Sequence, residues 1–420
     1  MHAPITIVAA GSRGDVQPYV ALGAGLQRAG YPVGVLTSQD FQPLVTAHGL
    51  AFYDLGGNIQ AVTQGMQHLL EQGNFLKILS RMQGAAQELA LQAVKNGLPA
   101  CQGSQLIISG LGGLFVGLAL AEKLGLPLIQ AYLYPFTPTR EFPGVLTPLP
   151  QWRLTTWANP LSHRLGQQMM WQATRPADNK ARREVLGLPP APLFGPFSST
   201  TAAPLIYGYS PQVIPRPGDW GDNQQVTGYW FLDPPASWQP PPALVDFLQN
   251  GPPPVFVGFG SMGSQKPEQT TALILQALAQ TGQRGVLLSD WNGFRSKALP
   301  ESVFLTDPVP YAWLFPQMTA VVHHGGAGTT AAGLAAGAPS ILAPFMGDQP
   351  FWAQRVHQLG VGPKPIPRRR LTVEHLSAAI HIAVTDDTMR AAAARLGERI
   401  REEDGVARAV AVIQQSGLVH

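Results

Sequence analysis

The segment "AVVHHGGAGTT", residues 320–330, joins a short β-branched run to a glycine-rich turn and two threonines. Its first residues, Ala320 to Val322, are typical of a buried parallel strand, and Thr329 with Thr330 is expected to cap the helix that follows. The free N–H groups and positive dipole at such a helix N-terminus suit a phosphate or a diphosphate. Three glycines in the turn allow close approach of the backbone: Gly325, Gly326 and Gly328.

The same rhythm of apolar run, turn and helical stretch recurs along the chain. In the first half, strands are expected at residues 5–10, 31–38, 50–55, 104–110 and 127–134, with helices at 18–30 and 114–125. In the second half, strands are expected at residues 254–262, 284–289, 302–307, 320–324 and 339–344, with helices at 268–280 and from about 330. Alternating strands and helices indicate parallel sheets, so we expect an α/β protein with two doubly wound Rossmann-like domains facing a central cleft.

The length of 420 residues exceeds one ordinary hydrophobic core and favours two domains. Prolines crowd together before residue 254, which indicates an interdomain linker at 216–253. We therefore expect an N-terminal domain at 1–215 and a C-terminal domain at 254–385. A C-terminal helical segment is expected at 386–420, and packing of this segment back on the N-terminal domain is left open.

The composition excludes several classes of protein. A net charge of +3 with no long basic block does not call for nucleic acid. The single cysteine, Cys101, favours a reducing compartment, and the N-terminus lacks the pattern of a secretion signal, so a cytoplasmic location is expected. The longest charge-free apolar stretch, 106–121, contains early glycines and indicates strand, turn and helix rather than a membrane span, which leaves peripheral membrane contact open.

Several segments together resemble one family of enzymes. They include "GSRGDVQPYVALG" (11–23), "FTPTREFPG" (136–144), "NKARREVLGLPP" (179–190), "GFGSMG" (258–263) and "HHGGAGTT" (323–330) with "GAPSILAPFMGDQPFWAQRV" (337–356). The chain resembles the bacterial and fungal steryl glucosyltransferases, which are related to the antibiotic aglycone glucosyltransferases. The resemblance implies a GT-B fold with the acceptor in the N-terminal domain and a UDP-sugar in the C-terminal domain. It also implies transfer with inversion and without a metal or other cofactor, and no Asp-x-Asp pair occurs in the sequence.

The resemblance assigns the donor site, with UDP-glucose as the donor substrate. His324 is expected to contact the diphosphate together with the helix N-terminus at Thr329, whereas His323 is interpreted as a core or supporting residue. Asp348 and Gln349 are expected to bind the sugar hydroxyls, and the alternative for Asp348 is a helix cap before Pro350. The remaining predicted donor residues are Ser12, Arg13, Gly14, Gly260, Ser261, Trp291, Val309, Gly326 and Gly328.

The acceptor hydroxyl needs a base, and Asp15 is the only carboxylate in the first βα turn. Pro18 suits the first position of a helix, which would make Gln17 the cap and leave Asp15 in the loop. The resemblance supports Asp15 as the catalytic base; the alternative is a loop-ordering hydrogen bond to Arg13 or to backbone amides. A flat apolar alcohol, namely a sterol, triterpenoid or polyphenol, is expected against the aromatic side chains Tyr132, Phe136 and Phe142.

Two other functions stay open from the sequence. Gly326, Gly328 and Ala331 match a dinucleotide-binding turn, with Asp348 about 20 residues on, which would suit a nicotinamide-dependent oxidoreductase. A GT-B epimerase or a sugar-nucleotide-binding protein without transferase activity is the other alternative. The histidine at the strand end favours the glucosyltransferase, because a dinucleotide turn does not call for it.

Overall fold

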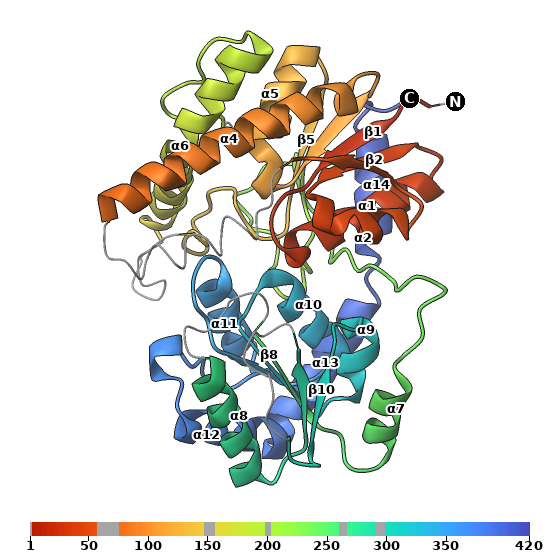
Figure 1. Cartoon of the computed structure of the whole chain (residues 1–420), viewed down its shortest axis with the longest axis vertical. Helices are drawn as coiled ribbons and strands as arrows, with labels where there is room; N and C mark the ends of the chain where they lie inside the picture. The colour runs from red at the N-terminus through yellow and green to blue at the C-terminus, as the bar shows by residue number, and fades with distance from the viewer. Residues whose placement is uncertain (1, 57–74, 147–155, 198–202, 260–266, 290–298) are drawn as a thin grey trace. The chain divides into compact units, whose positions relative to one another are not determined.

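The structure is a computed structural model that describes residues 2–56, 75–146, 156–197, 203–259, 267–289 and 299–420. It divides into two compact units, each built on its own sheet (Figure 1). The first unit comprises Met1–Pro211, Pro215–Leu232 and Asp404–His420, and the second comprises Gln212–Ile214 and Asp233–Glu403. The segment that the sequence assigned to a linker, 216–253, is thus shared between the two units.

The first unit contains a parallel sheet of seven strands in the described residues, in the order β3-β2-β1-β4-β5-β6-β7. In the central strand β1, Ile5 pairs with Val33 on one side and with Leu106 on the other. Ile5 and Ile7 join the core on one face of the sheet and Val8 joins the core on the other. The strands are β1 (Ile5–Val8), β2 (Val33–Thr37), β3 (Ala51–Asp54), β4 (Leu106–Ser109), β5 (Leu128–Tyr132), β6 (Leu205–Tyr207) and β7 (Gln224–Val226).

Helices cover both faces of this sheet. Val16, Val20 and Leu26 of α1 pack in one core, and Val94 of α4 with Leu120 of α5 packs in the other. The α-helices of the unit are α1 (Arg13–Arg28), α2 (Gln42–Thr46), α4 (Phe75–Cys101), α5 (Leu114–Leu124), α6 (Asn159–Ala181) and α14 (Gly405–Gln415). In the described residues, two 3-10 turns accompany them, η1 (Gln39–Phe41) and η2 (Leu111–Gly113).

The sequence analysis predicted no helix between residues 136 and 204. The structure has there the 23-residue helix α6, which continues directly into a π-helical turn, η4 (Arg182–Leu186). Its mostly polar composition concealed the helix, because only part of α6 is buried: Trp171 is 1% exposed, whereas Leu161 is 64% exposed.

The last helix, α14, completes the core of the first unit. Val406, Val410 and Ile413 belong to the same buried cluster as α1 and β1, and α14 lies beside α1 in Figure 1. A Cβ atom on Gly25 of α1 would lie 2.3 Å from Cγ1 of Val406, so the two helices meet closely at this glycine. The preceding helix, α13, belongs to the second unit, so the predicted segment 386–420 is divided between the units.

The second unit contains a parallel sheet of five strands in the described residues, in the order β10-β9-β8-β11-β12. Val255 and Val257 of β8 face one core and Phe256 faces the other. The strands are β8 (Val255–Gly258), β9 (Gly285–Leu288), β10 (Val303–Thr306), β11 (Ala320–His323) and β12 (Ser340–Leu342). The helices and turns are α7 (Pro242–Gln249), α8 (Pro267–Thr281), α9 (Tyr311–Leu314), η5 (Phe315–Gln317), α10 (Ala327–Ala336), α11 (Gln349–Gln358), η6 (Arg368–Arg370), α12 (Val373–Thr385) and α13 (Asp387–Arg401).

The expected fold class is confirmed: each unit is a parallel α/β sheet. Among the described residues, no helix is both long enough and apolar enough to cross a membrane.

Candidate active site

In the first unit, the turn after β1 holds Asp15 in a defined position. The backbone N–H and the hydroxyl of Ser12 both donate to Oδ2 of Asp15, each at 2.8 Å. The backbone N–H of Asp15 in turn donates to the carbonyl of Ser12 at 2.9 Å. A Cβ atom on Gly11, whose φ is +135°, would lie 2.6 Å from Oδ2, so only glycine leaves room for the carboxylate here.

The helix begins earlier than the sequence indicated. Ser12 is the N-cap of α1, Asp15 is the third residue of the helix and Pro18 lies inside it, so the prediction of Gln17 as the cap was wrong. In a capping box, the residue before the helix and the side chain of the third helical residue hydrogen-bond to each other's ends. Here the contacts between Ser12 and Asp15 outweigh the preference of Pro18 for the first turn. Asp15 therefore orders the helix start through the amide of Ser12, one of the alternatives that the sequence left open.

Asp15 still has the properties of a candidate base. Its side chain reaches solvent. Its two side-chain hydrogen bonds from described residues both end on Oδ2, so Oδ1 receives none from them. The surrounding protein desolvates the carboxyl and raises its pKa above the usual value, while the hydrogen bonds from Ser12 act in the opposite direction.

Two other residues of this turn were predicted to bind the donor. Arg13 is exposed and its Nε donates to Oε1 of Gln17 at 2.9 Å. Gly14 is the second residue of α1. The structure thus places both beside Ser12 and Asp15, and their role toward a donor stays a prediction.

The predicted acceptor residues do not form one surface in the first unit. Tyr132 is 1% exposed and Phe136 is 6% exposed, and their rings pack with centroids 5.1 Å apart. Phe142 packs elsewhere, with its ring centroid 5.9 Å from that of His163. Two of the three side chains are therefore brought together, and both are parts of the core.

In the second unit, the turn after β11 places His324 at the start of α10. Gly326 is the N-cap and the helix begins at Ala327, so the prediction that Thr329 and Thr330 cap it was wrong. Thr329 is the third residue of the helix, and the N–H of Thr330 donates to the carbonyl of Gly326 at 2.9 Å. The glycine adopts the extended N-cap conformation without a side chain, which leaves the free N–H groups of the first turn uncovered.

The His324 ring lies against this turn. A Cβ atom on Gly326 would be 2.6 Å from Nε2 of His324, so the glycine is required for the ring to lie over the helix start. Burial lowers the pKa of His324 to about 4, which makes the imidazole neutral at pH 7. A neutral ring can donate one hydrogen bond to a phosphate oxygen beside the helix N-terminus.

His323 has a different environment. It is fully buried, and its Nδ1 accepts the backbone N–H of Gly325 at 3.1 Å. Burial, with a smaller effect of His324, lowers its pKa to about 3. The buried His323 ring therefore orders the glycine turn through its hydrogen bond with Gly325. This agrees with the interpretation of His323 as a core or supporting residue.

The start of α11 lies next to the same turn. A Cβ atom on Gly325 would be 3.2 Å from the carbonyl oxygen of Gln349. Oε1 of Gln349 accepts the backbone N–H groups of Phe345 and Met346 at 2.8 and 3.2 Å. Both lone pairs of this oxygen are thus used within the protein, and toward a ligand the Gln349 amide can only donate.

Asp348 is the N-cap of α11, and Pro350 is the second residue of that helix. No described backbone N–H is capped by the Asp348 side chain; its Oδ2 accepts the indole Nε1–H of Trp352 at 2.9 Å. Trp352 is a positioning residue that the sequence analysis missed, although its spacing of four residues from Asp348 places both on one face of the helix.

The remaining predicted donor residues add little to this geometry. Val309 is 9% exposed and packs in the core of the second unit with Leu314. Gly328 is the second residue of α10. Three predicted contacts lie outside the described residues: Gly260, Ser261 and Trp291. No group of three or more His, Cys, Asp or Glu side chains suited to a metal ion occurs in the described part of the chain.

Family models match both halves of the chain. Residues 5–143 match the glycosyltransferase family 28 N-terminal domain, and residues 273–408 match the C-terminal domain of erythromycin biosynthesis protein CIII-like proteins.

Curated relatives match nearly the whole chain. The sterol 3-beta-glucosyltransferase UGT80B1 of Arabidopsis thaliana is 38% identical over 416 residues, which cover 97% of this chain and 67% of that protein. The sterol 3-beta-glucosyltransferase of Cryptococcus neoformans is 36% identical over 438 residues, and there the chain spans 27% of the relative's length. Among solved structures, the chain is similar to the Streptomyces sp. SF2575 glycosyltransferase SsfS6, complexed with thymidine diphosphate. The TM-score is 0.65 at 22% sequence identity, and the match covers 99% of this chain and 100% of that chain.

Proposed function

Because this chain belongs to the sterol glucosyltransferase family and is a glycosyltransferase of GT-B fold, we propose that it transfers glucose from UDP-glucose to a hydroxyl group of a hydrophobic acceptor. The acceptor class is the sterols, with triterpenoids and polyphenols as related candidates. Transfer proceeds with inversion at the anomeric carbon and without a metal ion or other cofactor.

The observation that carries the donor half of this proposal is the position of the His324 ring over the first turn of α10. When UDP-glucose binds, the amides of that turn and a neutral imidazole would donate to the diphosphate. As the bond between the anomeric carbon and the phosphate oxygen breaks, these donors stabilise the charge that develops on the leaving UDP. The Gln349 amide would donate to a hexose hydroxyl, and Asp348 would accept from another.

The acceptor half rests on Asp15. Its carboxylate removes the proton of the acceptor hydroxyl while that oxygen attacks the anomeric carbon, which yields the β-glucoside, UDP and a protonated carboxyl. The raised pKa of Asp15 supports this role, because a stronger base takes the proton of an alcohol more readily. The protein is proposed to act in the cytoplasm.

The proposal is tested by incubating the protein with UDP-glucose and a panel of a sterol, a triterpenoid and a flavonoid. A β-linked glucoside formed equally well with and without a chelator is the expected result, as measured by mass spectrometry and by the anomeric proton coupling in NMR. An α-linked product, or loss of the activity on chelation, would contradict the mechanism.

The alternatives make different predictions. The oxidoreductase hypothesis is not favoured, since the relatives are named glucosyltransferases. Calorimetric titration with UDP and with NAD separates the two, and binding of NAD without binding of UDP would reject the transferase. An epimerised UDP-sugar without a glucoside would instead favour the epimerase, and binding of UDP-glucose without any product would favour the non-catalytic alternative.

A further inference from the structure

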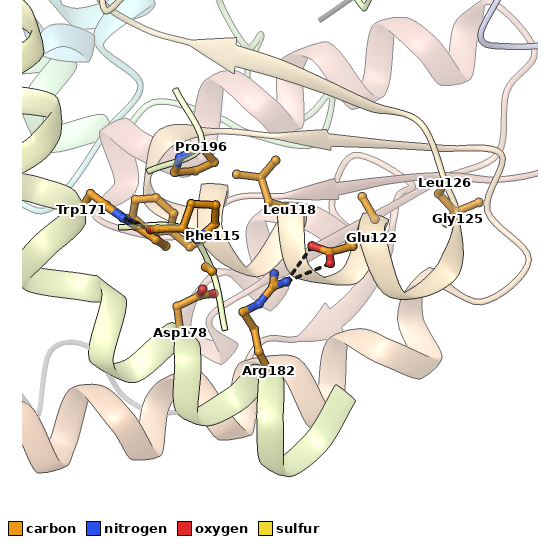
Figure 2. Close-up of a pocket in the computed structure, with 12 residues that line it drawn as sticks. Phe115, Leu118, Glu122, Gly125, Leu126, Trp171, Asp178, Arg182 and Pro196 are labelled. Carbon is orange, nitrogen blue, oxygen red and sulfur yellow. Dashed lines mark hydrogen bonds and ion pairs between the residues drawn. The ribbon is translucent and has the colours of Figure 1, made fainter. Parts of the chain in front are cut away.

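A pocket of about 440 Å³ lies within the first unit, between α5 and α6 and the loop that follows the π-helical turn (Figure 2). Its size falls within the range of small-molecule sites, which runs from about 300 to 1,000 Å³. It is lined neither by Asp15 nor by the three predicted acceptor residues. The lining is therefore separate from those residues but adjoins them, because Phe115 and Phe136 both pack on Phe197, with ring centroids 6.2 and 5.5 Å from it.

One part of the pocket is apolar and aromatic. The rings of Phe115 and Trp171 pack with centroids 4.9 Å apart, and Leu118 lies beside them on α5. The indole N–H of Trp171 donates to the carbonyl of Pro192 at 3.0 Å, so its hydrogen-bonding group is satisfied by the protein. This part offers a ligand contact area rather than hydrogen bonds.

The other part carries charge. Nη2 of Arg182 contacts both oxygens of Glu122, at 2.9 and 2.8 Å, and Nε of Arg182 donates to the carbonyl of Pro189 at 2.8 Å. Nη1 of Arg182 makes no hydrogen bond to a described residue. Arg182 begins the π-helical turn, and such turns in helices occur frequently at functional sites.

Asp178 is the unexplained group in this pocket. The residue is only 8% exposed, yet its carboxylate accepts no hydrogen bond from any described residue. Figure 2 shows the side chains of Asp178 and Arg182 extending from their helix toward α5, into the space between the helices. The carboxylate oxygens are not sealed off by the protein but open on the pocket, so a hydrogen-bond donor on a ligand can reach them.

We propose that the pocket binds an apolar alcohol, whose hydroxyl donates to Asp178 and accepts from Nη1 of Arg182 while its hydrocarbon body packs on Phe115 and Leu118. A hydroxyl fits because it both donates and accepts. An ammonium group fits Asp178 but is repelled by Arg182, and an anion is repelled by Asp178 and Glu122. The inference rests on the pocket alone and does not depend on the proposed glucosyl transfer.

The test is direct binding to the full chain without a nucleotide sugar, with three probes of nearly equal shape: 1-adamantanol, 1-adamantylamine and 1-methyladamantane. Calorimetry measures the first two, and competition against 1-adamantanol measures the third. The alcohol is expected to bind about 10- to 100-fold more tightly than the methyl analogue, as befits a hydrogen bond to a charged group, and more tightly than the amine.

Three variants locate the site. Asp178→Leu removes the acceptor and is expected to abolish the preference for the alcohol. Leu118→Trp fills the apolar part and is expected to weaken all three probes, and it leaves Asp178 intact should the first variant fold poorly. Glu184→Leu is the control, because Glu184 is an exposed carboxylate in the same π-helical turn and does not line the pocket.

The proposal is overturned if the parent protein binds none of the probes or binds the methyl analogue or the amine as tightly as the alcohol. Undiminished alcohol binding in both Asp178→Leu and Leu118→Trp would place the ligand elsewhere and would equally overturn it. Because no glucoside is measured, these outcomes are independent of whether the protein transfers glucose.

Discussion

Oδ2 of Asp15 accepts two hydrogen bonds from Ser12, one from its backbone N–H and one from its hydroxyl, each at 2.8 Å. One carboxylate oxygen thus orders the start of α1, and Oδ1 is left without a donor among the described residues. A single side chain can therefore hold the helix end and offer a basic oxygen at the carboxyl end of β1.

Asp15→Asn is expected to keep the fold and the affinity for UDP-glucose but to lower turnover by about 10²- to 10⁴-fold, the usual loss for a missing general base. The amide oxygen of asparagine can accept the same two hydrogen bonds, so the helix start is preserved. Initial rates and donor calorimetry measure the two effects. Turnover within a few-fold of the parent would show that Asp15 is not the base.

Ser12→Ala separates the two roles of that carboxylate. The hydrogen bonds from Ser12 lower the pKa of Asp15, so loss of the hydroxyl raises it and moves the acid limb of the pH–rate profile to higher pH. Loss of this hydroxyl at the helix N-terminus should also lower the free energy of unfolding by about 0.5 to 2 kcal/mol. A stability loss with an unmoved pH profile would indicate that Asp15 serves only the helix.

His324→Ala is expected to raise the barrier to transfer by about 2 to 4 kcal/mol, as for loss of one oxyanion-stabilising donor. Since the pKa of His324 is lowered to about 4, its ring stays neutral and its contribution should be constant between pH 6 and 8. Rates across that range test this, with His381→Ala, an exposed histidine of the same unit, as the control. A folded His324→Ala protein with parental rate and donor affinity would refute the assignment.

The two roles of Gln349 can be distinguished by a matched pair of variants. Gln349→Ala leaves the N–H groups of Phe345 and Met346 without their acceptor and should lower stability by about 1 to 3 kcal/mol. Gln349→Glu keeps an acceptor for them and removes the donor toward the sugar, and it also adds a negative charge at a buried position.

Both Gln349 variants, and Asp348→Ala, are expected to reduce discrimination among UDP-hexoses while UDP affinity is nearly kept. Calorimetry with UDP and UDP-glucose is the measurement. Equal losses for both ligands in Gln349→Ala would argue against a contact with the hexose.

Asp178→Asn should stabilise the ligand-free protein at neutral pH. Burial raises the pKa of Asp178 from 3.8 to about 6, with Arg182 acting in the opposite direction and Glu122 in the same one. The folded state therefore favours the protonated carboxyl, and this stabilisation, fully present below pH 3.8, is lost as the pH rises through 6.

The advantage of the Asp178→Asn variant should grow between pH 4 and 7 by on the order of 3 kcal/mol, the equivalent of such a pKa shift. Denaturant unfolding at several pH values measures it. A variant less stable than the parent at pH 7 would show that the carboxylate has a structural partner.

The sheets could be predicted from the sequence because their central strands are buried on both faces and are therefore continuously apolar, as in "ITIV" and "AVVH". Helix α6 could not, because its one buried face is diluted by polar residues and interrupted by Pro176. The start of α1 was misplaced for a local reason: Ser12 and Asp15 have the spacing of a capping box, whereas the prediction relied on Pro18 alone.

The positions of Asp15 and His324 in turns after strands could be predicted from the sequence, but their contacts could not. Sequence spacing placed His324 beside a glycine turn, yet the approach of Gly325 to Gln349 depends on how β12 and α11 return to β11. Oε1 of Gln349 accepts two backbone N–H groups, so only its NH₂ group is left for a sugar. These hydrogen bonds likewise depend on the tertiary fold.

The packing of α14 on α1 has a consequence for the order of synthesis on the ribosome. The strands and helices that surround α1 are translated long before residues 405–415, and until these emerge, the face of α1 around Gly25 has no partner. The second unit lies between them in the sequence and can assemble first. The N-terminal unit is thus the last to mature although it is the first to be made, and part of its apolar core is uncovered during that interval.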